Sequence, residues 1–170
     1  MKWLGAALLI IVCSMLGFEY SSRLNKRPEH IRQIKSSLLI LEAEIQYSQS
    51  KLQDSFKVIA SQVPSPTNQL FFNLYHKLYK FHGDLADLWK ACIKEYVKTS
   101  SLTTFEQEVL VQFGNTLGQY DVNQQGKYIS VTINHLDRLL NEAEQKRKKY
   151  SNLTKTLGVL LGLFIVLLLF

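Results

Sequence analysis

Histidine, cysteine and acidic side chains are the residues of this sequence that could bind a metal ion or transfer a proton. The chain has four histidines, at positions 30, 76, 82 and 135. His76 and His82 are six residues apart, which places them on different faces of a helix. Neither has a cysteine or carboxylate at a metal-ligand spacing. The sequence therefore predicts no metal site and no cofactor.

The remaining candidates for acid–base or nucleophilic chemistry are three acidic pairs and one cysteine. The pairs are Glu42 with Glu44, Asp84 with Asp87, and Glu106 with Glu108. Residues two apart diverge on a helix, whereas an acidic pair three apart suits the first turn of a helix. Cys92 shares an apolar stripe with Trp89 and Tyr96, as expected of a core residue. With no phosphate-binding glycine loop, nucleophile elbow or HExxH motif, we predict that the protein is not an enzyme.

Two runs without any charge, residues 3–18 and 157–170, stand at the ends of the chain. As a helix, the first would be about 24 Å long, slightly less than a ~30 Å hydrocarbon core. The alternatives are a cleaved signal peptide for the first run and a helix docked on a partner for the second. A single basic residue before the first run and a poor cleavage site at 14–17 favour an uncleaved anchor. We predict transmembrane segments within residues 1–22 and 153–170.

The net charge of +6 comes largely from basic residues that flank these two runs on their inner sides. The candidate membrane-interface residues are Arg23, Lys26, Arg27, Lys146, Arg147, Lys148, Lys149 and Lys155. Charge crowded against apolar segments is typical of contact with anionic lipid headgroups, so we do not expect nucleic acid as a partner. The positive-inside rule places the intervening domain, residues 23–152, in the cytoplasm.

The apolar residues of this domain recur every three or four positions, which predicts helices and no strands. We expect six helices, with starts at Pro28, Leu52, a Ser65 cap, an Asp84 cap, a Thr103–Glu106 capping box and an Asp121 cap. Phe81 and Phe105 are expected in the core with the other stripe residues. Short connections predict an all-α antiparallel bundle flanked by the two transmembrane helices, with the first and last domain helices paired.

Several short motifs resemble those of the stage III sporulation protein AB family of endospore-forming bacteria. Residues 110–121 read LVQFGNTLGQYD and are similar to the family signature FGxxLGxxD. The signature positions are Phe113, Gly114, Leu117, Gly118 and Asp121. Arg27–Pro28, the LEAEIQY stretch at 41–47 and the LGVLLG stretch at 157–162 also resemble the family. The resemblance therefore covers the chain from end to end.

The resemblance implies a subunit of the channel complex built between mother cell and forespore, in the mother-cell membrane. The domain is similar to the cytoplasmic helical domains of the inner-membrane platform proteins of type II secretion and type IV pilus systems. The implied partners are the ATPase encoded with it, stage III sporulation protein AA, and other membrane subunits of the complex. With one helical domain and two membrane segments, the chain would have to form homo-oligomers to match a platform protein.

The resemblance also suggests roles for individual residues. Glu42 and Glu44 are the candidate partner contacts. Gly118 is expected at a helix C-terminus, whereas Gly114 fits either a helix end or close contact with a neighbouring helix. A scaffold that docks the ATPase is the leading function. A sensor whose helical domain moves relative to its membrane helices is the alternative, and a homodimer that changes conformation with a ligand would favour it.

Gly158 and Gly162 have the small-xxx-small spacing that lets two helices approach closely in lipid. We predict that Gly162→Leu weakens assembly in the membrane and leaves the helical domain folded. Recovery of the complex from solubilised membranes measures this effect. Unchanged recovery would show that these glycines do not pack helices together.

Overall fold

The computed structural model describes residues 2–48, 51–81, 83–118 and 121–169. Within these ranges, side chains are described from residue 21 to residue 150 except at 48, and beyond them at 12, 15, 18, 19, 156 and 160. The described residues form helices and no strands, which confirms the all-α prediction. Among these described residues, no helix is long and apolar enough to cross a membrane.

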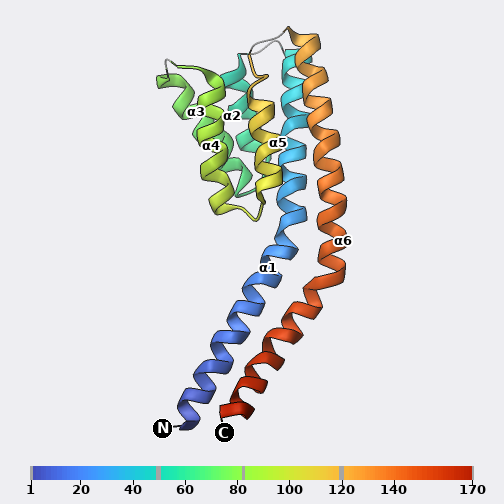
Figure 1. The fold of residues 1–170 in the computed structure, drawn as a ribbon. Coiled ribbons are helices and arrows are strands. Elements are labelled where there is room, and N and C mark those ends of the chain that lie inside the picture. The colour runs from blue at the N-terminus through green and yellow to red at the C-terminus, as the bar shows by residue number, and fades with distance from the viewer. Residues whose placement is uncertain (1, 49–50, 82, 119–120, 170) are drawn as a thin grey trace. The chain divides into compact units, whose positions relative to one another are not determined.

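The described part of the chain contains six α-helices and one π-helical segment (Figure 1). They are α1 (Lys2–Ala43), the π-helix η1 (Glu44–Ser48), α2 (Leu52–Gln62), α3 (Thr67–Lys80), α4 (Leu85–Thr99), α5 (Thr104–Gly114) and α6 (Val122–Leu169). Helix α3 packs against α2 and α4, and α4 packs against α5. The four short helices therefore form one continuous layer of neighbours.

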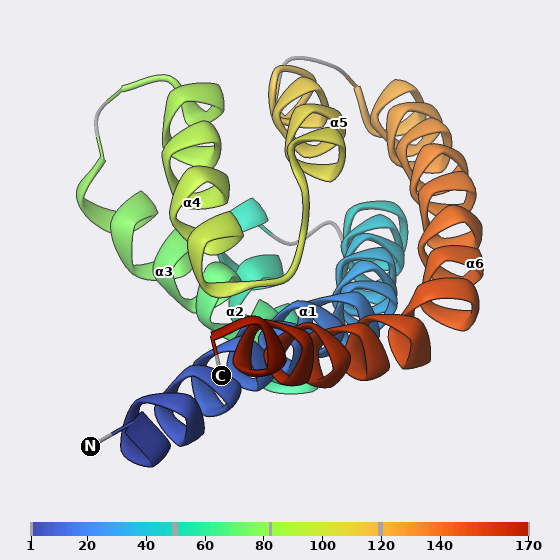
Figure 2. The same cartoon turned by 60° about the horizontal axis from the view of Figure 1, so that its bottom comes forward.

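The chain divides into two compact units. One unit contains residues 1–28 and 142–170, and the other contains residues 29–141. In the first, the beginning of α1 and the end of α6 run side by side, with both chain ends at the same end of the unit (Figures 1 and 2). The second, called the helical unit below, holds the rest of α1, η1, α2 to α5 and the start of α6. The predicted boundaries at residues 22 and 152 stay a prediction.

Three predicted helix caps are confirmed. The Asp84 carboxylate accepts a hydrogen bond from the Ala86 backbone N–H at 3.0 Å, at the start of α4. The Thr103 backbone N–H donates to the Glu106 carboxylate at 2.7 Å, which forms half of the expected capping box. The Asp121 carboxylate accepts from Gln124 N–H at 2.8 Å before α6. Local side-chain chemistry thus sets where these helices begin.

Two predicted helix starts are wrong. Pro28 lies inside α1 instead of beginning a helix. A proline removes one backbone hydrogen bond, and here the helix continues on both sides of it. Ser65 does not cap α3, because Pro66 is the N-cap residue and no side chain caps the helix. Thr67, the first residue of α3, instead directs its hydroxyl to Gln33 of α1, so a tertiary contact replaces the local cap.

The core of the helical unit is built from the predicted apolar stripes, with Trp89 of α4 among its largest fully buried side chains. The ring centroids of Phe113, Phe71 and Phe56 lie 5.5, 6.2 and 6.3 Å from that of Trp89. These phenylalanines come from α5, α3 and α2. One indole therefore contacts an aromatic ring from each of the other three short helices.

Two residues expected in the core are exposed instead. Phe81 is 39% exposed, because it follows the last residue of α3 in an extended conformation and the helical spacing no longer applies. Phe105 is 66% exposed, and the adjacent Glu106 is buried in its place. The capping box explains this second error, since it turns the Glu106 side chain back toward Thr103.

A buried polar chain links three helices of the helical unit. The Tyr96 hydroxyl of α4 lies 2.8 Å from Thr67 Oγ1 of α3, and Thr67 donates to Gln33 Oε1 of α1 at 2.9 Å. Since Thr67 uses its only proton for Gln33, the Tyr96 hydroxyl donates to Thr67. Each member is buried and hydrogen-bonded, which avoids the penalty of a lone polar group in the core. Burial also raises the pKa of Tyr96 to about 12.

We predict that Tyr96 makes the fold sensitive to alkali. The unfolded chain loses this proton near pH ~10, whereas the folded chain keeps it until about pH 12. The free energy of unfolding should therefore fall by about 2–3 kcal/mol as pH rises between those values. Tyr96→Phe should remove this part of the pH dependence, at the loss of about 1 kcal/mol at neutral pH.

Urea unfolding of the full chain in detergent, followed by circular dichroism from pH 8 to 11.5, measures this effect. Tyr79→Phe is the matched control, because Tyr79 is 78% exposed. Identical pH profiles for wild type and Tyr96→Phe would contradict the prediction.

Candidate functional site

Several of the residues that could do chemistry have structural partners, whereas His82 lies outside the described residues. His30 accepts the Ser101 backbone N–H at its Nδ1, at 2.8 Å. The His76 ring packs edge-on against Phe72, with centroids 4.3 Å apart. Burial raises the pKa of the Cys92 thiol, the reverse of what a thiolate nucleophile needs. Among the described residues, no three histidine, cysteine or acidic side chains gather in a way that could hold a metal ion.

The signature residue Gly114 makes room for the central tryptophan. The Trp89 indole N–H donates to the Leu110 carbonyl oxygen at 2.7 Å, which brings the ring against α5. A Cβ atom built on Gly114 would overlap this ring, with Trp89 Cγ only 2.9 Å away. Both interpretations left open by the sequence apply, because Gly114 is the last residue of α5 and also lies in close contact with Trp89 of α4. The glycine is therefore required by packing at the end of α5.

The other signature residues shape the connection from α5 to α6. Phe113 and Leu117 are buried, as predicted. Gly118 has a φ of +76°, a conformation that favours glycine and ends the turn after α5. Asp121 caps α6. The signature thus encodes one packed helix end, one turn and one helix start, and its residues serve the fold.

Within the helical unit, α1 and α6 pair in antiparallel orientation, as predicted. Lys35 Nζ of α1 donates to the Asp137 carboxylate of α6 at 2.5 Å. Eleven residues further along the chain, in η1, Gln46 Nε2 lies 2.9 Å from a Cβ atom built on Gly126, which is eleven residues before Asp137 in α6. Leu38 and Leu136 are both buried. The two helices therefore keep one register along this length.

The candidate partner contacts Glu42 and Glu44 lie where α1 passes into η1. Both side chains are half-buried, and Glu42 Oε1 is 3.9 Å from a Cβ atom built on Gly126. Tyr47 in the same π-helix is 85% exposed. No sequence signal predicted this π-helix, although such segments often occur at functional sites. The two acids thus border the α1–α6 pair and leave part of their surface open to a partner.

The candidate membrane-interface residues differ in exposure. Arg23 is exposed and pairs with Glu19 at 3.2 Å. Arg27 is buried at 7% exposure, which leaves little of it for a lipid headgroup. The exposed members are Lys26, Lys146, Lys148 and Lys149, and Arg147 is half-buried. The calls on Lys155, Gly158 and Gly162 fall outside the residues whose side chains are described.

These features define an all-helical protein whose first and last helices pair and whose two apolar ends share one unit. The sequence matches the family described as Stage III sporulation protein AB over residues 2–170. Stage III sporulation protein AB of Bacillus subtilis (strain 168) is 37% identical over 169 residues, 99% of each chain. A solved structure of Stage III sporulation protein AB (SpoIIIAB) matches with a TM-score of 0.69 and 36% identity, covering 73% of this chain and 98% of that chain.

The chain therefore belongs to the stage III sporulation protein AB family, a family of sporulation proteins. The resemblance inferred from the short motifs is confirmed. No catalytic role is indicated by the family or by the relatives that match.

We predict that Gly114→Ala destabilises the fold. Alanine favours a helix over glycine by up to ~1 kcal/mol, but here its methyl group would displace Trp89 and weaken the bond to Leu110. Overpacking of this kind typically costs about 1–3 kcal/mol. Urea unfolding of the full chain in detergent gives the free-energy change.

Gly126→Ala is the matched control, because its new methyl group meets the end of the exposed, flexible Gln46 side chain. This variant should be neutral or slightly stabilised. Equal stability of the two alanine variants would show that Gly114 is not needed for Trp89 packing.

Proposed function

We propose that the chain is a non-enzymatic platform subunit of the channel complex between mother cell and forespore, and that it docks a cytoplasmic ATPase onto that complex. It would be anchored in the mother-cell membrane by both apolar ends, with the helical unit facing the cytoplasm. The partners would be stage III sporulation protein AA, the other membrane subunits and further copies of the chain.

The grouping of the two apolar ends into one compact unit is the observation that carries this proposal. The ends are far apart in sequence, and each contains a charge-free run of 14 or 16 residues, 3–18 and 157–170. Two antiparallel apolar helices suit insertion into one bilayer, because every backbone polar group is satisfied within each helix. The helical unit between them would then sit on one side of the membrane.

The charge distribution supports a cytoplasmic helical unit. Lys26 is exposed just after the first run, and Lys146, Lys148 and Lys149 are exposed before the second. Cytoplasmic flanks of membrane helices are enriched in such residues. An ATPase needs cytoplasmic ATP, so this orientation is also the one in which an ATPase could reach the helical unit.

The packing of the helical unit suits a rigid docking surface. Its four short helices share one aromatic cluster, and a buried polar chain from Tyr96 to Gln33 ties them to α1. A core with interlocked rings and satisfied polar groups resists internal rearrangement. Docking a partner on a rigid surface requires no such rearrangement.

We predict that protease cleaves the helical unit in inverted membrane vesicles and leaves it intact in spheroplasts, with a known cytoplasmic marker treated alongside. The tagged full-length chain should also co-purify with stage III sporulation protein AA from solubilised membranes. An unrelated membrane protein carrying the same tag controls for non-specific capture.

Cleavage in spheroplasts would place the helical unit outside the cytoplasm and overturn the ATPase proposal. Correct orientation without co-purification would keep the membrane topology and reject the ATPase as a direct partner.

A further inference from the structure

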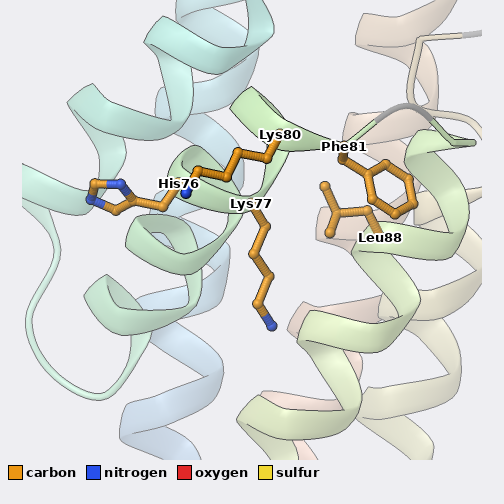
Figure 3. Close-up of a pocket in the computed structure, with 5 residues that line it drawn as sticks. All are labelled: His76, Lys77, Lys80, Phe81 and Leu88. Atoms are coloured by element: carbon orange, nitrogen blue, oxygen red, sulfur yellow. The ribbon is translucent and has the colours of Figure 1, made fainter.

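An open pocket lies between α3 and α4, away from the signature residues. It has a volume of about 500 Å³ and is lined by His76, Lys77, Lys80, Phe81 and Leu88. Figure 3 shows Phe81 and Leu88 close together on one side, with the Lys77 side chain extending between the helices. Leu88 is buried at the base, whereas Phe81 is part of the open wall. The pocket thus combines an apolar base with a cationic rim.

Phe81, in the pocket wall, lies close to Gly83. A Cβ atom built on Gly83 would lie 2.9 Å from the Phe81 ring, so this ring packs directly against the glycine. Phe81 thus presents an exposed aromatic ring beside the pocket, and aromatic residues are enriched at binding surfaces.

Beside the pocket, α3 presents an aromatic stripe to solvent. Phe72 is 55% exposed, and Tyr79, about two turns further along the same face, is more exposed still. The His76 ring lies between them and contacts both Phe72 and Tyr75. Scattered exposed apolar residues are ordinary, but a continuous aromatic stripe next to a pocket marks an interaction surface.

On α3, the charged residues of this surface are all basic. The 14 residues of that helix include Lys77 and Lys80 but no aspartate or glutamate. Lys77 Nζ donates to Glu95 of α4 at 2.9 Å, and this hydrogen bond raises the lysine pKa, so Lys77 stays charged at physiological pH. Both side chains of this pair are about half exposed, which leaves Lys77 able to bind a second carboxylate.

We propose that this α3–α4 pocket docks an acidic segment of the cytoplasmic ATPase, with one apolar side chain in the pocket and flanking carboxylates on Lys77 and Lys80. The inference rests on the proposed function and names the surface and the chemistry of its partner. The pocket volume of about 500 Å³ is enough for one apolar side chain together with part of the segment that carries it. The apolar base favours a peptide over a free anion, which would gain nothing from Phe81 and Leu88.

Binding would be measured with the full chain in nanodiscs of neutral phosphatidylcholine. The probes are purified stage III sporulation protein AA and a fluorescent peptide with one phenylalanine between glutamates. The test variants are Lys77→Ala/Lys80→Ala and Phe81→Ala. The matched control is Lys90→Ala/Lys94→Ala, which removes the same charge from exposed positions of α4 that do not line the pocket. Circular dichroism checks that every variant is folded.

Wild type should bind both probes, and each test variant should bind them at least tenfold more weakly, while the control stays within about threefold. Glu95→Gln should strengthen binding several-fold, because it frees Lys77 from its internal partner. This gain separates a binding role for Lys77 from a merely structural one.

Equal loss in the test and control variants would overturn the proposal, since total charge alone would then explain the binding. Binding of the ATPase that none of these substitutions alters would keep the proposed function and reject this surface. Binding of the peptide without the ATPase would keep the surface chemistry and reject the ATPase as its partner. If the substitutions weaken binding only to vesicles containing phosphatidylglycerol, the surface contacts lipid and the proposal fails.

Discussion

The burial of one indole ring between four helices is the constraint on which the helical unit depends. Trp89 contacts an aromatic ring from α2, α3 and α5, and its N–H is satisfied by the Leu110 carbonyl oxygen. The ring can lie this close to α5 only because residue 114 has no side chain. A large aromatic residue gains most from burial when its polar atom also has a partner. The signature glycine and the tryptophan, far apart in sequence, are therefore one structural feature.

Buried hydrogen bonds connect two of the helices around Trp89, α3 and α4, to α1. Thr67 of α3 and Tyr96 of α4 together hold Gln33 of α1, and every group in the chain is buried. A buried hydrogen-bond network satisfies all of its polar groups in only one arrangement of the helices, whereas apolar side chains can shift past one another. The partly exposed ion pair between Lys35 and Asp137 adds a contact between α1 and α6. These directional contacts link α1 to α3, α4 and α6.

Helical periodicity and capping chemistry were enough to predict most helix starts and most buried residues. These signals are local, so they failed where a tertiary contact replaced a local one. Thr67 serves Gln33 instead of a helix cap, and Glu106 takes the buried position expected for Phe105. The partner of Gly114 could not be predicted, because no local pattern relates it to Trp89. The pocket was also missed, although the absence of acidic residues from α3 was visible in the sequence.

The pocket lies on the same two helices as the buried polar chain. Lys77 and Lys80 lie on the same helix as Thr67, and Leu88 lies on the same helix as Tyr96. A partner bound between α3 and α4 would therefore contact the two helices whose Thr67 and Tyr96 belong to the hydrogen-bonded chain with Gln33. Because the packed core resists internal rearrangement, a force on this surface would pass through the buried polar chain to α1. That helix continues in sequence into the N-terminal apolar run. Within the helical unit, a partner on this surface would therefore be linked to α1 by buried, hydrogen-bonded contacts.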